Sequence, residues 1–317
     1  MNSYKNFKVS INILRKYSSI FIFILLFILM TFISPAFCTI DNLINLIRQI
    51  SVIAILAFGS TFVIISGEFD ISIGALMSFV GVIVAGQIVE GYPIWISIPI
   101  GLFAGMIVGL INGLIVTKLK INAFITTLGT LYIIRGIANI YTGGTLVQVM
   151  AAKFPEFAII GKGFLINIPV PVIIMIVICI ICQIFLSKSK IGRIFFSIGS
   201  NPMASKFSGI NVDFYKIISF VIGGLLAAIG GVILSARLGI VDASVGIGYE
   251  FDAITAVVLG GASLKGGKGN IYLTLIGALI IGLVRNGLNL LLVSTQLQSI
   301  FTGLIFIFVV AVAREDK

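Results

Sequence analysis

Residues 164–186 read FLINIPVPVIIMIVICIICQIFL, an apolar run without Asp, Glu, Lys or Arg. A helix needs about 20 apolar residues to cross the hydrocarbon core of a bilayer. The run is long enough, so the sequence predicts a membrane-spanning helix here. It also contains a Cys-x-x-Cys pair, Cys179 and Cys182. We interpret these cysteines as small apolar residues of the helix, because a redox pair needs an accessible, electropositive site.

The composition of the whole chain also indicates a membrane protein. Of the 317 residues, 59% are apolar and 10% are charged, and the mean hydropathy is +1.22. Soluble domains carry about 25% charged residues, so this chain is too apolar to cover a water-facing surface. The chain has no His and three Cys. This excludes His-dependent catalysis, His-ligated zinc and a disulfide framework.

Further apolar runs predict an all-α polytopic membrane protein with about ten transmembrane helices. The predicted spans cover residues 17–37, 44–66, 71–89, 94–117, 122–141, 164–186, 214–236, 251–264, 271–293 and 297–313. The eighth run is short and ends in a Gly-Gly pair, so it is either a half-span or a re-entrant segment packed inside protein. The first run also resembles a signal peptide, because basic residues precede it and small residues follow it. We favour an uncleaved first span.

The distribution of Lys and Arg predicts the orientation of the spans. With the N-terminus inside, most of the basic residues fall in the cytoplasmic segments 1–16, 118–120, 187–216, 265–268 and 314–317. The other side holds only Lys153, Lys162 and Arg237. Basic residues favour the cytoplasmic side, so we expect a multi-pass protein of the bacterial inner or plasma membrane with both termini in the cytoplasm. The net charge is +10. We interpret the basic residues as determinants of topology that contact anionic lipid head groups, and we expect no nucleic-acid partner.

The chain is expected to form one transmembrane domain, because no linker or low-complexity segment divides it. This domain covers residues 17–313, between a cytoplasmic N-terminal segment, 1–16, and a cytoplasmic tail, 314–317. Its longest polar stretch is the cytoplasmic loop 187–216.

That loop contains a short segment with helix signals at both ends. Asn201 is a good N-cap, Pro202 suits the first helical position and Gly209 suits the C-terminal stop. Met203 and Phe207 are four residues apart and share a face. The pattern is typical of a docking helix for a soluble partner; a helix lying on the membrane surface is the alternative. The predicted docking segment comprises Asn201, Pro202, Met203, Ala204, Ser205, Lys206, Phe207, Ser208 and Gly209.

Several polar residues fall inside predicted spans, where such groups face a neighbouring helix or a water path. Asn and Thr supply donors and acceptors that match sugar hydroxyl groups. The predicted translocation-pathway residues are Asn112, Thr126, Thr127, Arg135, Asn139, Asn286 and Asn289. Hydrogen bonding between helices is the alternative role. We expect no acidic residue in the middle of a span, which argues against ion-coupled transport.

The break between the second and third spans reads SGEFDISIG, residues 66–74. Gly67 allows a sharp turn, and Asp70 or Ser72 can accept the free N–H groups of the next helix. The break is either a mobile, partner-facing corner or a capped tight turn.

Two further motifs resemble catalytic elements but lack the residues that the chemistry needs. The stretch 260–269, GGASLKGGKG, is not a phosphate loop: Ala262 stands where the first Gly is required, and Gly269 replaces the Ser or Thr that would hold magnesium. Glu250 and Asp252 lie near the end of a span, and we interpret them as part of a solvated loop. We therefore expect no cofactor and no catalytic site in this chain.

Several motifs follow one another in a characteristic order. They are GEFDISIG (67–74), AFITTLGT (123–130), GSNP (199–202), SGINV (208–212), GYEFDAI (248–254), VLGGASL (258–264), GGKG (266–269) and NGLNL (286–290). With these motifs, residues 40–313 resemble the membrane permease subunits of bacterial ATP-binding-cassette (ABC) importers for ribose and related simple sugars. At Glu68 that family usually has a small or apolar residue, so the role of this turn is not carried over.

The resemblance implies an ABC importer permease fold within a larger machine. Two permease copies form a homodimer around the pathway, a cytoplasmic ABC ATPase holds ATP and magnesium, and an extracytoplasmic sugar-binding protein delivers the sugar. The segment 201–209 is then the coupling helix that sits in a groove of the ATPase. Transport follows alternating access. Ribose is the first expectation, with xylose, galactose, inositol or a ribose-like signalling furanose open. An ATPase-independent secondary transporter or channel is the alternative function.

Overall fold

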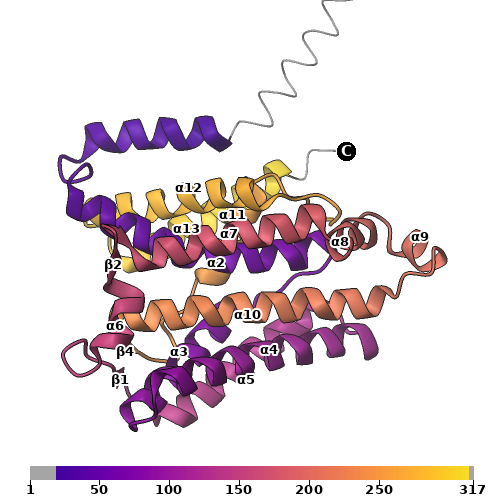
Figure 1. The fold of residues 1–317 in the computed structure, drawn as a ribbon. Coiled ribbons are helices and arrows are strands. Elements are labelled where there is room, and N and C mark those ends of the chain that lie inside the picture. The colour runs from indigo at the N-terminus through magenta and orange to yellow at the C-terminus, as the bar shows by residue number, and fades with distance from the viewer. Residues whose placement is uncertain (1–18, 314–317) are drawn as a thin grey trace, which may run out of the picture.

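Helices form nearly all the regular structure of residues 19–313, the part of the chain that the computed structural model describes. After an unlabelled first helix, Ser19–Ile33, the elements in Figure 1 are α2 (Ile40–Ile65), α3 (Ile73–Val89), α4 (Ile94–Lys118), α5 (Ala123–Thr142), β1 (Val147–Gln148), α6 (Pro155–Lys162), β2 (Phe164–Leu165), β3 (Ile168–Pro169), α7 (Val170–Lys188), α8 (Lys190–Ser200), α9 (Pro202–Phe207), α10 (Val212–Leu238), β4 (Ile240–Val241), α11 (Tyr249–Leu259), α12 (Ile271–Leu290) and α13 (Thr295–Ala313).

Six described helices are long and apolar enough to cross a membrane: α2, α4, α5, α7, α10 and α12. Three shorter apolar helices, Ser19–Ile33, α3 and α13, accompany them. Every predicted span contains a helix, but the predicted count of about ten spans is not confirmed. The described residues also contain the helices α6, α8 and α9, which lie outside the predicted spans.

Two predicted spans differ from the structure at their boundaries. The helix expected over 164–186 starts only at Val170, because residues 164–169 form the hairpin β2–β3. Its two turn residues, Ile166 and Asn167, have positive φ angles, as tight hairpin turns require. The segment expected over 251–264 contains α11, whose eleven residues rise about 16 Å. This is well short of the roughly 30 Å of a bilayer core, so α11 has the length of a half-span.

The helices α2 and α10 lie at the centre of the bundle, and α10 packs most extensively on α4. Glycines at every fourth position of α4 allow this close approach. A side-chain carbon added at Gly109 would lie 2.3 Å from the carbonyl oxygen of Phe220, and one added at Gly105 would lie 2.7 Å from that of Gly224. Small residues at this spacing are typical of tightly packed membrane helices.

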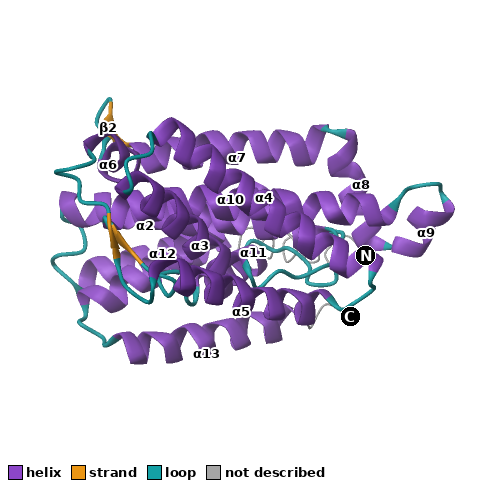
Figure 2. Cartoon of the chain, turned by 90° about the horizontal axis from the view of Figure 1, so that it is seen from below, coloured by secondary structure: helices purple, strands orange, loops and turns teal. Residues whose placement is uncertain are grey.

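Different short elements mark the two ends of the bundle (Figure 2). At one end lies α9, beyond the ends of the long helices. At the other end lie α6, the hairpin β2–β3 and the antiparallel pair β1–β4, in which Val147 is opposite Val241. The pair β1–β4 joins the segment after α5 to the segment after α10.

Candidate functional site

The helix predicted between residues 201 and 209 is present as α9. Asn201 is its N-cap and accepts the backbone N–H of Ala204 at 2.9 Å. Pro202 occupies the first helical position, and Gly209, with φ +81°, follows the end of the helix. The predicted apolar pair is exposed, Met203 to 61% and Phe207 to 84%. A short capped helix therefore presents two large apolar side chains away from the bundle.

This helix has a defined attachment to the rest of the chain. The hydroxyl groups of Ser197 in α8 and Ser205 in α9 form a hydrogen bond at 2.8 Å. Ser205 is the only buried residue of α9. Asn211 then caps α10 by accepting the N–H of Phe214 at 3.1 Å. The structure thus fixes α9 between two longer helices and leaves its apolar face free.

The break between α2 and α3 carries a buried polar network. Oδ1 of Asp70 accepts the backbone N–H and the hydroxyl of Ser72, at 2.8 and 2.6 Å. Nδ2 of Asn112 in α4 donates to Oγ of Ser72 at 3.0 Å, and Oδ1 of Asn112 accepts from Thr130 in α5 at 2.6 Å. All four side chains are buried. The start of α3 is therefore fixed by polar groups from three segments, and Asp70 orders the break rather than capping α3 directly.

Two more predicted pathway residues lie beside this network. Oγ1 of Thr127 accepts the backbone N–H of Ile71 at 3.2 Å. The carbonyl oxygen of Thr126 accepts the hydroxyl of Thr130 at 3.1 Å, while Oγ1 of Thr126 itself is buried and has no hydrogen-bond partner. The structure therefore brings Asn112, Thr126 and Thr127 together at the break before α3.

The other predicted pathway residues lie elsewhere. Arg135 and Asn139 are farther along α5, half-buried and exposed respectively. Asn286 is buried and forms two hydrogen bonds with Asn42 in α2, at 2.8 and 3.1 Å. Asn289 is exposed and accepts from Gln298 at 2.9 Å. For Asn286 the structure thus fits the alternative role, hydrogen bonding between helices.

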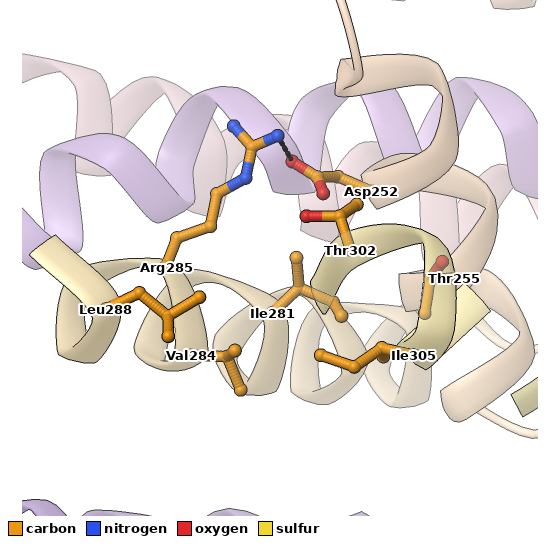
Figure 3. Close-up of a pocket in the computed structure, with 8 residues that line it drawn as sticks. All are labelled: Asp252, Thr255, Ile281, Val284, Arg285, Leu288, Thr302 and Ile305. Carbon is orange, nitrogen blue, oxygen red and sulfur yellow. Dashed lines mark ion pairs between the residues drawn. The ribbon is translucent and has the colours of Figure 1, made fainter. Parts of the chain in front are cut away.

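Glu250 and Asp252 are not in a solvated loop, and that interpretation was wrong. Both lie in the first turn of α11, with exposures of 4% and 1%. Asp252 forms an ion pair with Arg285 of α12 at 2.6 Å, and Arg285 lies 4.9 Å from the ring centroid of Tyr249. Figure 3 shows the two charged side chains pointing toward each other. Both acids lie at or next to the start of the span predicted over 251–264, not in its middle, so the expectation of no acidic residue in the middle of a span is not contradicted.

A cavity of about 10 Å³ lies beside this ion pair, with room for roughly one water molecule. Its lining includes Thr255 of α11 and Thr302 and Ile305 of α13 (Figure 3). Arg285 was the signal that could have located the buried acid. It falls inside a predicted span, and a charge there needs a partner of opposite sign.

Comparison with known proteins identifies relatives along nearly the whole chain. The family described as branched-chain amino acid transport system / permease component matches residues 42–310. The chain is 40% identical to the ribose import permease protein RbsC of Haemophilus influenzae over 310 residues, which are 98% of this chain and 96% of that protein. It is 39% identical to RbsC of Bacillus subtilis over 293 residues, 92% of this chain and 91% of that protein.

A relative with another sugar in its name is also similar. The chain is 38% identical to the L-arabinose transport system permease protein AraH of Escherichia coli over 299 residues, 94% of this chain and 90% of that protein. No solved structure matches the chain. These relatives are permeases rather than enzymes, and they confirm the resemblance to sugar permeases. The chain is therefore a membrane permease that belongs to the branched-chain amino acid transport system / permease component family.

Proposed function

We propose that this chain is the permease subunit of an ATP-driven importer that moves ribose or a related monosaccharide into the cytoplasm. The observation that carries the proposal is the similarity over 98% of the chain to a protein named as a ribose import permease. Relatives named for L-arabinose and D-allose keep the substrate class at simple sugars, with ribose as the first candidate.

The ATPase docks on α9 in this proposal. Support comes from the projection of α9 beyond the bundle (Figure 1) and from the exposed pair Met203 and Phe207. An apolar helix face of this kind suits a groove on a soluble partner. ATP and magnesium are then held by the ATPase, a second copy of this chain completes the pathway, and an extracytoplasmic binding protein delivers the sugar.

The proposed membrane arrangement has ten crossing segments within residues 17–313 and both termini in the cytoplasm. The six long helices and the three shorter apolar helices support nine of these segments. The tenth comprises α11 and the irregular segments that flank it, since α11 itself has only the length of a half-span. The end that carries α9 is the cytoplasmic end, since the loop 187–216 is rich in Lys and Arg. Asn112, Thr126 and Thr127 remain our candidates for the pathway, next to the break before α3.

Uptake into proteoliposomes tests the function. The permease is reconstituted with its ATPase and binding-protein partners, and uptake of radiolabelled ribose, arabinose and allose is measured with and without ATP. We expect ATP-dependent uptake, fastest for ribose. Equal uptake without ATP would identify a channel or a secondary transporter. ATPase activity stimulated by a loaded binding protein, without uptake of any of the three sugars, would exclude these substrates.

A further inference from the structure

Three glycine-bearing segments that are far apart in the sequence meet beside α9. Gly67 follows α2, Gly199 lies in the last turn of α8, and the pair Gly266 and Gly267 lies between α11 and α12. We call these four residues the backbone joint. Each segment belongs to a motif of its own in the sequence. The stretch 260–269, which contains Gly266 and Gly267, is the one that resembles a phosphate loop without being one.

Direct contact between main chains defines the backbone joint. The N–H of Gly267 donates to the carbonyl oxygen of Ile65 at 2.9 Å. A side-chain carbon added at Gly199 would lie 1.8 Å from that oxygen and 2.5 Å from the nitrogen of Gly267. One added at Gly266 would lie 2.8 Å from Cα of Gly67 and 3.0 Å from Cα of Gly199. No side chain fits at Gly199, Gly266 or Gly267 without displacing a neighbour. Gly67 has space for an added carbon, but its φ of +87° is a backbone conformation that favours glycine.

The backbone joint is close in sequence to both candidate functional elements. Gly199 lies two residues before Asn201, the N-cap of α9. Gly67 lies three residues before Asp70, which orders the buried polar network at the start of α3. Gly266 and Gly267 follow α11, which carries the buried Asp252. The joint therefore lies two residues from the N-cap of α9 and three from Asp70, while α11 ends at Leu259, seven residues before Gly266.

An ion pair provides a second connection on the other side of α9. Lys216, in the second turn of α10, contacts the carboxylate of Glu68, next to Gly67. The side chains are only 20% and 16% exposed, so water weakens this pair less than a surface pair. The α2–α3 break is thus attached both to the helix before α9 and to the helix after it.

Backbone segments that touch directly cannot shift independently of one another. A side chain can absorb a displacement by changing its rotamer, whereas packed backbone segments must move together. The glycines also explain why a phosphate-loop-like stretch occurs without a nucleotide site, because its Gly-Gly pair is needed for the contact with α8.

We propose that the backbone joint, together with the Glu68–Lys216 pair, is the positioning device that transmits movement of α9 to the start of α3 and to α11. The inference rests on the proposed function, in which α9 docks an ATPase. It assigns a role to Gly67, Gly199, Gly266 and Gly267, and to Glu68, which departs from the usual residue of the resembling permeases.

The test compares Gly199→Ala with Gly303→Ala in the reconstituted complex. Gly303 lies within α13 and has no atom within 4 Å of an added side-chain carbon, so its variant is the matched control. Uptake per ATP hydrolysed is measured together with ATPase binding. We expect Gly303→Ala to match the wild type. Gly199→Ala is expected to bind the ATPase and hydrolyse ATP, but to lose at least about fivefold in uptake per ATP.

If folded Gly199→Ala shows wild-type uptake per ATP, the coupling role of the backbone joint is overturned, while the proposed function stands. Absence of ATP-dependent uptake in the wild type and in Gly303→Ala would instead overturn the proposed function and the coupling role with it. Gly199→Ala could instead lose ATPase binding and uptake in parallel, with uptake per ATP unchanged. That result would show that the joint only stabilises the fold, and it would also overturn the proposal.

If Gly199→Ala does not fold, charge reversal of the Glu68–Lys216 pair tests the coupling role instead. The single variants Glu68→Lys and Lys216→Glu place like charges together, whereas the double variant restores an opposite pair. We expect each single variant to lower uptake per ATP and the double variant to recover it. Wild-type uptake per ATP in both single variants would contradict the inference.

Discussion

At the scale of single residues, the pair Asp252–Arg285 is the most buried ion pair among residues 19–313. Its atoms are 2.6 Å apart, and Asp252 is almost fully buried. A carboxylate in such surroundings is stable only with a partner of opposite charge. The pair joins α11, which is too short to span the membrane alone, to the long helix α12. It therefore fixes the half-span in place.

We predict that Asp252→Asn destabilises the protein by about 3–5 kcal/mol, because it leaves the partly buried Arg285 without its counter-charge. Thermal unfolding in detergent measures the change. The control is Asp213→Asn, which breaks the exposed pair of Asp213 with Lys118 at 3.2 Å and is expected to cost less than about 1 kcal/mol. Equal stability of Asp252→Asn and the wild type would contradict a structural role for the pair.

At the scale of elements, α9 depends on its cap, because six residues form too short a helix to be stable by propensity alone. We predict that Asn201→Ala costs α9 about 1 kcal/mol, which corresponds to roughly fivefold weaker binding of the ATPase. Asn201→Ser keeps an N-cap oxygen and is expected to bind normally. The affinity of purified permease for the ATPase in detergent measures both. Unchanged binding of Asn201→Ala would separate docking from the helical state of α9.

The close contact of α4 with α10 gives a second prediction for elements. Gly109→Ala places a methyl group 2.3 Å from the carbonyl oxygen of Phe220, so the two helices must separate. We expect a loss of about 1–3 kcal/mol in stability, seen as a lower unfolding midpoint in detergent. Gly303→Ala, at a position with free space, is expected to leave the midpoint unchanged or raised. A midpoint for Gly109→Ala equal to that of the wild type would show that this contact is not tight.

Sequence predicted the elements whose signals are local. Apolar runs located a helix in every predicted span, and the residues Asn201, Pro202 and Gly209 located α9. The hairpin at 164–169 was missed because its apolar residues continue the run of the following span. The buried state of Glu250 and Asp252 was missed because it depends on helices distant in the sequence. The meeting of Gly67, Gly199 and Gly266 is a tertiary contact that no local pattern contains.

At the scale of the whole molecule, the two ends of the bundle carry different short elements. One end carries α9 and the backbone joint, and the other carries α6 and the two small sheets (Figure 2). In the proposed orientation the first end meets the ATPase in the cytoplasm, and the second meets the binding protein outside.

Cysteine labelling tests this orientation. Cys179 and Cys182 are buried and Cys38 is exposed, so a Cys38→Ser background is suitable. In intact cells, or in spheroplasts where an outer membrane is present, we expect a membrane-impermeant maleimide to label Lys153→Cys but not Ser208→Cys. In inside-out vesicles the pattern is expected to reverse. Labelling of Ser208→Cys from outside would invert the proposed topology.

The central claim is that ATP hydrolysis on a partner drives sugar uptake through this chain by way of α9. Its most direct test is ATP-dependent ribose uptake by proteoliposomes containing Phe207→Asp or Phe207→Leu permease. Phe207 is 84% exposed, so neither change disturbs the bundle, while only the first places a charge on the apolar face. We predict that Phe207→Asp abolishes uptake and that Phe207→Leu retains it. Uptake by folded Phe207→Asp permease at the wild-type rate would contradict the account.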